Sequence, residues 1–150
     1  MVTDYAWNSP GRLAEVDSAS MTEPVTLTYN AIGKRVGKAV GSDKKKFLYD
    51  YNRLLQELDA DTDQTRMLYT STIDEYGDLL SEYAPAGGGN SLYHHYDALG
   101  STDVLIDDAG SDTFVYRAFG ELKSGDASAT PFTFVGRESN KGDRLLFSEE

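Results

Sequence analysis

The residues best suited to chemistry in this chain lie between Tyr93 and Leu122, where the sequence reads YHHYDALGSTDVLIDDAGSDTFVYRAFGEL. These thirty residues include two adjacent histidines, five other aromatic side chains and six carboxylates. Imidazole and carboxylate groups are the side chains that commonly bind metal ions or transfer protons. The stretch is therefore the first candidate for an active site.

The adjacent histidines, His94 and His95, are expected to be structural. Successive side chains on a strand point to opposite faces, so this pair cannot bind one metal ion without a bulge. A metal-binding or general-base role for either histidine is the alternative.

Two groups of aspartates have the composition of a calcium-binding loop. They are Asp103, Asp107, Asp108 and Asp112, and separately Asp59, Asp61 and Asp63. The first group does not have the spacing of an EF-hand loop, and the second lacks its glycine and terminal glutamate. The first group also contains the run DDAG, which reads more simply as a hairpin turn. We predict no metal site and no cofactor.

Nucleophilic catalysis is not indicated either. Ser101, Ser124 and Ser128 have no assigned histidine partner, and no Gly-x-Ser-x-Gly motif is present. The glycine-rich run GGGN leads into an expected strand, whereas a phosphate-binding loop leads into a helix. The sequence therefore predicts a protein that is not an enzyme.

Charge and composition exclude several classes of partner. The 150 residues carry a net charge of −11, which argues against a nucleic acid or an anionic membrane surface as partner. Charge is uneven, with +1 in residues 1–50, −7 in 51–100 and −5 in 101–150. The one basic cluster, Lys44-Lys45-Lys46, is expected in a solvated turn. There is no cysteine, no apolar run long enough to span a bilayer and no signal-peptide pattern.

A repeated pattern accounts for the composition of the stretch from Tyr93 to Leu122 better than a single active site does. An aromatic residue is followed four positions later by Gly or Arg in the pairs Trp7–Gly11, Tyr29–Gly33, Tyr49–Arg53, Tyr96–Gly100 and Tyr116–Gly120. The aromatic anchors are separated by 22, 20, 47 and 20 residues. The long gap has room for one degenerate copy, for which Glu75–Tyr83 is the candidate. Six hairpin-sized units then cover most of the chain.

Each unit has a physical interpretation. An alternating apolar and polar segment before the anchor, such as VTLTY, is typical of a half-buried strand. Asp or Asn after the anchor, as at Asp97, can bond the backbone two residues on and start a turn. Glycine supplies the positive φ of a tight turn, notably at Gly100 and Gly120. Arginines near these turns (Arg12, Arg35, Arg53 and Arg137) are expected to pair with carboxylates or stack on aromatics of the adjacent hairpin.

The fold class that follows is all-β, an antiparallel hairpin ribbon or meander. Strands are expected near residues 4–8, 12–17, 24–30, 34–39, 46–50, 53–59, 65–70, 78–83, 91–97, 102–106, 112–118, 131–135 and 144–148. The run APAGGGN is the most flexible joint, because its glycines add backbone freedom without packing. We expect residues 87–90 to separate a repeat region, 1–86, from a second region, 91–150.

The chain resembles RHS/YD-repeat proteins, the family of bacterial RHS proteins, polymorphic-toxin shells and animal teneurins. TYNAIGKRVGKAV and YDYNRLLQELDAD resemble YD repeats. The run from Tyr93 to Glu138 resembles the start of the RHS repeat-associated core, including the motif PFTFVGRE with Gly136 and Arg137. Asp103 stands where the family usually has Arg, and Arg117 where it usually has Asp. No Asp-Pro dipeptide is present, so the family's self-cleavage motif is not carried over.

This resemblance implies a β-ribbon that spirals, in full-length members, into a hollow shell around a cargo polypeptide. A non-enzymatic wall segment of such a shell, in a toxin-delivery or cell-surface context, is the leading functional hypothesis. The expected partners are further RHS/YD repeats or a cargo polypeptide, and self-association is expected of the isolated chain. A carbohydrate- or protein-binding β module, with a glycan as ligand, is one alternative. A fragment of a larger RHS protein without independent function is the other. Secretion or surface exposure is implied by the family alone.

Overall fold

The protein is almost entirely β. The computed structural model describes residues 2–19, 21–73, 79–126, 128–136, 138–139 and 146–147. Helical structure in these ranges consists of three single 3-10 turns, η1 (Pro85–Gly87), η2 (Ala118–Gly120) and η3 (Phe134–Gly136). None of them has the length or apolar character of a membrane-spanning helix. The expected all-β fold is confirmed.

Eleven strands form one antiparallel sheet in sequence order. They are β1 (Thr3–Trp7), β2 (Leu13–Ser18), β3 (Val25–Tyr29), β4 (Arg35–Val40), β5 (Asp43–Asp50), β6 (Arg53–Asp59), β7 (Thr65–Ser71), β8 (Leu79–Tyr83), β9 (Ser91–Tyr96), β10 (Thr102–Ile106) and β11 (Ser111–Thr113). Each strand pairs with the next along the chain, so the sheet is a pure meander. Short antiparallel connections suffice for this topology because no strand must cross over its neighbours.

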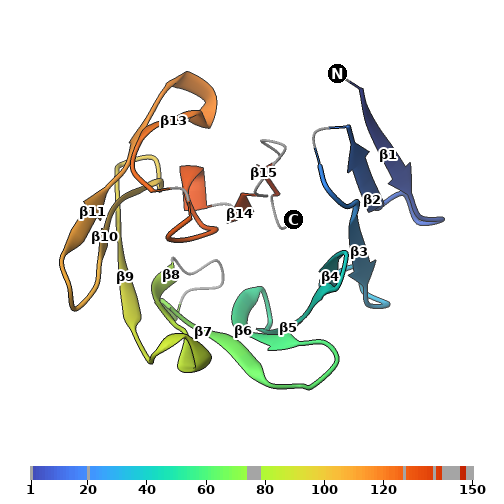
Figure 1. Cartoon of the computed structure of the whole chain (residues 1–150), viewed down its shortest axis with the longest axis horizontal. Helices are drawn as coiled ribbons and strands as arrows, with labels where there is room; N and C mark the ends of the chain where they lie inside the picture. Colours follow the sequence, from blue (N-terminus) through green and yellow to red (C-terminus); the bar gives the residue numbers. More distant parts are fainter. Residues whose placement is uncertain are drawn as a thin grey trace.

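The sheet is strongly curved (Figure 1). A register shift lies next to the turn in each of the hairpins β1–β2, β3–β4, β5–β6, β7–β8 and β9–β10. Such bulges bend the strand and increase its twist. Because a bulge recurs in each of these five hairpins, the bend accumulates, and the ribbon closes part of a ring rather than lying flat (Figure 1).

One face of the sheet is buried and lies on the inside of the curve; we call it the inner face. Directly paired residues share a face, so the cross-strand pairs Val16–Val25, Phe47–Glu57, Tyr69–Glu82 and His94–Leu105 belong to it. Their exposed fractions run from 0% to 7%. Near the N-terminus this face is apolar, with Val16, Val25 and Leu27 forming a cluster. From β6 onward it also carries buried polar groups.

The chain beyond β11 crosses onto the inside of the curve. A hairpin of β12 (Val115–Tyr116) and β13 (Leu122–Ser124) precedes residues 130–135, which we call the inner segment. The inner segment lies within the curve of the sheet in Figure 1. β14 (Glu138–Ser139) and β15 (Leu146–Phe147) pair with each other.

Two expected strands are wrong. Residues 112–118 do not form one strand, because the chain breaks between β11 and β12. Residues 131–135 are not a strand either: Pro131 lacks an N–H donor, Phe132 makes one isolated bridge, and Val135 has a φ of 55° inside η3. The strand expected at 144–148 lies mostly outside the described residues, as do residues 74–78 between β7 and β8, which include the start of the candidate copy Glu75–Tyr83.

The position of the lysine run is also corrected. Lys44, Lys45 and Lys46 lie inside β5, and the turn before them contains only Gly41 and Ser42. The glycine-rich joint connects β8 to β9, which pair in the same sheet. The division of the chain at residues 87–90 remains a prediction.

Candidate functional site

Three of the anchor tyrosines each bond the hairpin that precedes their own. Tyr29 Oη donates a hydrogen bond to the carbonyl oxygen of Leu13 at 2.7 Å. Tyr96 Oη donates to Leu79 O at 2.6 Å, and Tyr116 Oη donates to Thr102 O at 2.7 Å. The three accepting residues are the first residues of β2, β8 and β10. The partner of each of these three hydroxyls is therefore a backbone carbonyl of the preceding hairpin.

The accepting carbonyls share a position in the repeat. Leu13 pairs with Trp7, Leu79 with Ser71 and Thr102 with Tyr96, each next to the register shift of its hairpin. A bulge disrupts the regular ladder locally. Tyr29, Tyr96 and Tyr116 therefore each supply a donor beside the bulge of the preceding hairpin, and this contact joins consecutive units.

The protonated hydroxyl is the form that these contacts require. Burial, together with the nearby carboxylates of Asp97 and Asp103, raises the pKa of Tyr116 to about 12. Burial also raises the pKa of Tyr29, against the opposing effect of Arg35 and Arg12. Both side chains therefore stay hydrogen-bond donors well above neutral pH.

The repeat continues through the long gap in a form that the sequence pattern missed. The β7–β8 hairpin fills this gap, and its register shift lies at Ser71. Ser71 follows Tyr49 by 22 residues, as Tyr29 follows Trp7. The anchor position of this unit therefore holds a serine, whereas we had placed the degenerate copy at Glu75–Tyr83.

The turn residues adopt the conformations that the units need. Gly11, Gly33, Gly100 and Gly120 have φ values of 80°, 94°, 80° and 87°. In the unit where Arg53 replaces glycine, Tyr51 takes the left-handed conformation, with a φ of 53°. Side-chain oxygens of the residues after the anchors bond the backbone N–H four residues on, from Asn8 to Arg12, Asn30 to Lys34 and Asp97 to Ser101. Only Asp97 also bonds two residues on, to Leu99.

Cationic side chains stack on the aromatics of the ribbon. The Arg35 guanidinium lies 4.9 Å from the centroid of Phe47, and Lys34 Nζ lies 4.7 Å from that of Tyr49. Arg12 lies farther, 6.0 Å from Tyr29. Arg53 instead bonds Asp50 and the carbonyl of Thr72. Arg137 lies outside the described residues.

Trp7, the first anchor, is 62% exposed.

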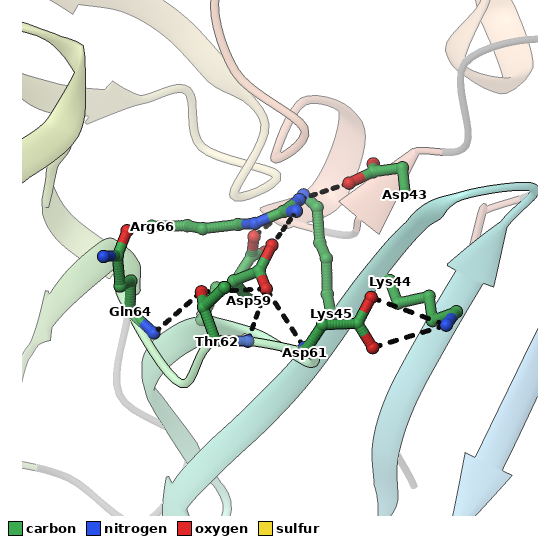
Figure 2. A network of polar contacts seen from close by, with 9 residues as sticks. Asp43, Lys44, Lys45, Asp59, Asp61, Thr62, Gln64 and Arg66 are labelled. Atoms are coloured by element: carbon green, nitrogen blue, oxygen red, sulfur yellow. Dashed lines mark hydrogen bonds and ion pairs between the residues drawn. The ribbon is translucent and has the colours of Figure 1, made fainter.

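The carboxylates of the turn after β6 pair with cations (Figure 2). Lys44 Nζ lies 3.3 Å from Asp61 Oδ1, and Lys46 Nζ lies 2.6 Å from Asp63 Oδ1. Arg66 lies between Asp59 and Asp43 and bonds both. The Arg66 hydrogen bond, helped by those from Thr62, holds the pKa of Asp59 well below its usual range. Asp61 and Asp63 therefore pair with the outer two lysines of the run in β5, and Asp59 pairs with Arg66.

The first aspartate group, Asp103, Asp107, Asp108 and Asp112, contains a hairpin turn. Asp107 Oδ1 accepts hydrogen bonds from the N–H groups of Ala109 and Gly110 at 2.8 Å, which makes the DDAG run a turn. Over the part of the chain that the structure describes, no group of three or more His, Asp or Glu side chains is placed to hold a metal ion.

The two histidines occupy opposite faces, as expected from a strand. His95 is exposed, whereas the His94 ring is buried on the inner face. His94 Nε2 lies 2.8 Å from Glu82 Oε1, and His94 Nδ1 lies 3.3 Å from Thr102 Oγ1. Thr130 of the inner segment donates to the same Glu82 oxygen. Hydroxyl, imidazole and carboxylate thus follow one another as in a catalytic triad.

The buried arrangement does not support nucleophilic catalysis. Thr102 is 0% exposed and its hydroxyl donates to Phe132 O at 3.0 Å. A nucleophile needs access to its substrate and a base that takes its proton, and neither is available to this hydroxyl. The group instead connects the inner segment to the sheet.

A second buried glutamate shows the same preference for internal partners. Glu57 is 5% exposed, accepts a hydrogen bond from Tyr69 Oη at 2.9 Å and pairs with Lys45 Nζ at 2.8 Å. Sequence reasoning missed both Glu57 and Glu82. The missed signal is their period: each occupies a strand position on the face where neighbouring strands place Phe47 and Tyr69.

Sequence comparison finds distant relatives among nucleases. The chain is 29% identical over 129 residues to the tRNA3(Ser)-specific nuclease WapA of Bacillus spizizenii, a match that covers 83% of the chain and 5% of the relative. It is 29% identical over 110 residues to the tRNA nuclease WapA of Bacillus subtilis, covering 72% of the chain and 4% of the relative. No protein-family model matches the chain.

Structural comparison places the fold among toxin complexes. The TcdB2–TccC3 complex superimposes with a TM-score of 0.65 at 16% identity, over 97% of this chain and 8% of that one. A Photorhabdus luminescens Tc holotoxin pore carrying a TccC3 substitution gives 0.62 at 16% identity, over 93% and 8%. At this identity the match shows the fold alone.

Together these findings confirm the expected resemblance to RHS/YD-repeat proteins. It consists of distant homology to WapA and of a fold shared with the RHS shell region of TccC3. The chain spans less than a tenth of the relatives and structures that it matches.

Proposed function

We propose that this chain is a non-enzymatic wall segment of an RHS-type shell. The proposal starts from its distant homology to WapA and from its fold, which is like that of a segment of an RHS shell. Its inner face would line a space that holds another polypeptide, and its strands would continue into further repeats. The observation that carries the proposal is the uninterrupted, curved eleven-stranded meander, whose units are fastened in series by Tyr29, Tyr96 and Tyr116.

The structure of the two faces supports this role. Buried side chains lie on the inner face of the sheet, and the inner segment lies within the curve on that side (Figure 1). A wall needs a regular backbone ladder and rigid side-chain contacts rather than a reactive group. The contacts of the anchor tyrosines are of this kind, since each satisfies a backbone carbonyl.

For the parent protein of such a wall we propose a toxin-delivery or surface setting, because its relatives by sequence are nucleases and the similar structures are Tc toxin complexes. Further repeats and an enclosed polypeptide are the proposed partners. No nucleic acid is proposed for this segment, because its net charge of −11 opposes a phosphate backbone.

A segment exchange tests the proposal. The region of TccC3 that superimposes on this chain would be replaced by the chain, and the chimaera would be co-expressed with TcdB2 and challenged with protease. We expect a closed assembly in which the enclosed polypeptide resists cleavage. A matched chimaera carrying Tyr29→Phe, Tyr96→Phe and Tyr116→Phe should assemble less well. An open or unassembled chimaera, from a segment that folds on its own, would contradict the role.

The outer face favours a second candidate, a protein-binding module. Leu48, Leu68, Tyr83, Tyr93 and Ile106 project from the face opposite the core and are 36% to 51% exposed. Register places Leu68 opposite Tyr83, and Tyr93 opposite Ile106. Exposed apolar rows of this kind mark interaction surfaces when they are contiguous. Glycan-array and pull-down experiments with a Tyr83→Ser, Tyr93→Ser variant as control would show specific capture if this candidate holds.

A further inference from the structure

The inner segment is held to the sheet through one buried polar cluster. Thr102 N donates to Thr133 O at 3.0 Å, and Thr102 Oγ1 donates to Phe132 O at 3.0 Å. Val135 N donates to Ser101 Oγ at 3.1 Å. Thr130 Oγ1 accepts from Phe132 N and donates to Glu82. Glu82 and His94 lie at the centre of these contacts.

The number of protons in this cluster follows from its donors and acceptors. A carbonyl oxygen can only accept, so the single proton of the Thr102 hydroxyl points to Phe132 O. The contact between Thr102 Oγ1 and His94 Nδ1 is then a hydrogen bond only if Nδ1 carries a proton. The 2.8 Å contact between His94 Nε2 and Glu82 Oε1 needs a second proton, on either atom. Together, His94 and Glu82 therefore hold two protons.

An ordinary histidine and glutamate hold one proton between them above the usual histidine pKa of about 6.5. The extra proton makes the buried pair neutral overall, which removes the cost of enclosing an uncompensated carboxylate. Two observations agree with this count. Both side chains are almost wholly buried, with 0% and 1% exposed, and Glu82 Oε2 is buried without a hydrogen-bond partner within the described structure.

Among the described residues, the groups that contact the His94 ring include no cation that would replace the proton. The groups around the His94 ring are Glu82 on β8, Thr102 on β10 and the stacked ring of Tyr96 on its own strand, 5.9 Å away. Beyond Thr102, Tyr116 Oη bonds the Thr102 carbonyl, and the carboxylates of Asp97 and Asp103 lie near that hydroxyl. All the charged groups among these are anionic, so they favour proton retention.

We propose that Glu82 and His94 form a buried proton-binding site that fastens the inner segment to the wall. When the second proton leaves, His94 Nδ1 becomes an acceptor and the Thr102 hydroxyl must turn toward it. Phe132 O then loses its donor from Thr102. Proton release is thus converted into the loss of one hydrogen bond between the wall and the inner segment.

The sign of the pH dependence follows from proton linkage. The docked state holds one proton more than the released state, so docking weakens as pH rises. One proton corresponds to at most a tenfold fall in the docking equilibrium constant per pH unit above about pH 6.5. The dependence ends at the pH where the docked pair itself releases the proton.

Amide hydrogen exchange measures docking directly. The exchange protection factors of the Thr102 and Val135 amides would be followed in the full chain between about pH 6.5 and 8.5, each corrected for intrinsic exchange. We expect protection to fall with rising pH, by up to tenfold per unit, while amides of β3 stay unchanged. His95→Gln, a change of the exposed neighbour, should keep this dependence, and His94→Gln should abolish it.

A second pair of variants separates the effect of the Thr102 hydroxyl from that of side-chain packing. Thr102→Ser retains the hydroxyl and should retain the pH dependence, whereas Thr102→Val removes it and should make protection independent of pH. In the unmodified chain, nitrogen NMR of the His94 ring should show Nδ1 protonated while the inner segment is docked. An unprotonated Nδ1 beside a Glu82 carboxylate, or pH-independent protection, would overturn the proposal even if no variant folds.

Discussion

At the scale of single residues, the hydroxyl of the anchor tyrosine distinguishes this ribbon from a generic hairpin repeat. Phenylalanine could fill the same position and pack its ring, but it could not donate to the carbonyl beside the preceding bulge. Tyr29, Tyr96 and Tyr116 each make that bond. This contact explains why tyrosine recurs at these positions, since aromatic packing alone would accept phenylalanine equally well.

Replacing Tyr29 by Phe should lower the free energy of unfolding by about 1 kcal/mol, because the Leu13 carbonyl would lose its donor. Urea denaturation of both proteins measures the difference. Tyr51→Phe is the matched control, since Tyr51 is 87% exposed and its hydroxyl should contribute nothing comparable. Equal losses in the two variants would show that the Tyr29 hydroxyl is not a structural contact.

Alkaline pH should weaken the contact made by Tyr116. Its folded pKa of about 12 exceeds the ordinary value of 10.0, so the folded state favours the protonated hydroxyl. The stabilisation is complete below pH 10 and is lost as pH rises from 10.0 toward about 12. Denaturation midpoints across this range should fall more steeply for the parent than for Tyr116→Phe. Parallel curves would refute the shift.

Residue-level function could be read from the sequence where local geometry decides it. Glycine at a positive-φ turn and tyrosine at an anchor have local causes, so Gly100 and Tyr96 were identified. Glu82 was not, because its burial depends on His94 from the next strand and on Thr130, 48 residues away. In β8 the simple alternation rule would bury Tyr83 and expose Glu82, whereas Tyr83 is 38% exposed and Glu82 1%.

At the scale of elements, the unit is a hairpin with one bulge beside its turn. The bulge bends the ribbon, the turn residue sets the tightness of the connection, and the tyrosine of the next unit bonds beside the bulge. The β7–β8 unit shows that a hairpin with Ser71 at the anchor position still fits the sheet. Pairing with neighbours therefore tolerates the loss of one anchor.

Glycine replacements in the turns should separate backbone strain from crowding. Gly100→Ala should cost roughly 1–2 kcal/mol from its positive φ alone, because nothing lies near the added methyl group. Gly120→Ala should cost more, since its methyl carbon would lie 2.6 Å from the Phe134 ring. Gly110→Ala has open space and no positive φ, and serves as control. Thermal melts of the three variants rank the effects, and an unchanged Gly100→Ala would contradict the turn assignment.

Element prediction succeeded where hydrophobic alternation coincided with a neighbouring hairpin. The ten strands from β1 to β10 lie within a few residues of their expected ranges. It failed at residues 131–135, whose apolar and aromatic composition is typical of a strand. Those side chains reach Tyr69, Tyr116 and the buried cluster from inside the curve, so tertiary contacts determine their backbone rather than strand pairing.

At the scale of the whole molecule, the sheet has two ends. β1 pairs only with β2, and β11 pairs only with β10, within the described residues. Unpaired strand edges are templates for another strand. Against this, the net charge of −11 keeps copies apart at low ionic strength. A wall segment should therefore associate through its edges once charge repulsion is screened.

Sedimentation velocity at two salt concentrations tests the wall assignment most directly. The Debye length falls from about 10 Å at 0.1 M salt to about 3 Å at 1 M, which screens repulsion between chains. We expect association that increases with salt, and a variant with Lys in place of Tyr5 on the β1 edge should associate less. A compact monomer that melts sharply at both concentrations would contradict the account, because it would mean that the ribbon closes on itself as a complete small domain.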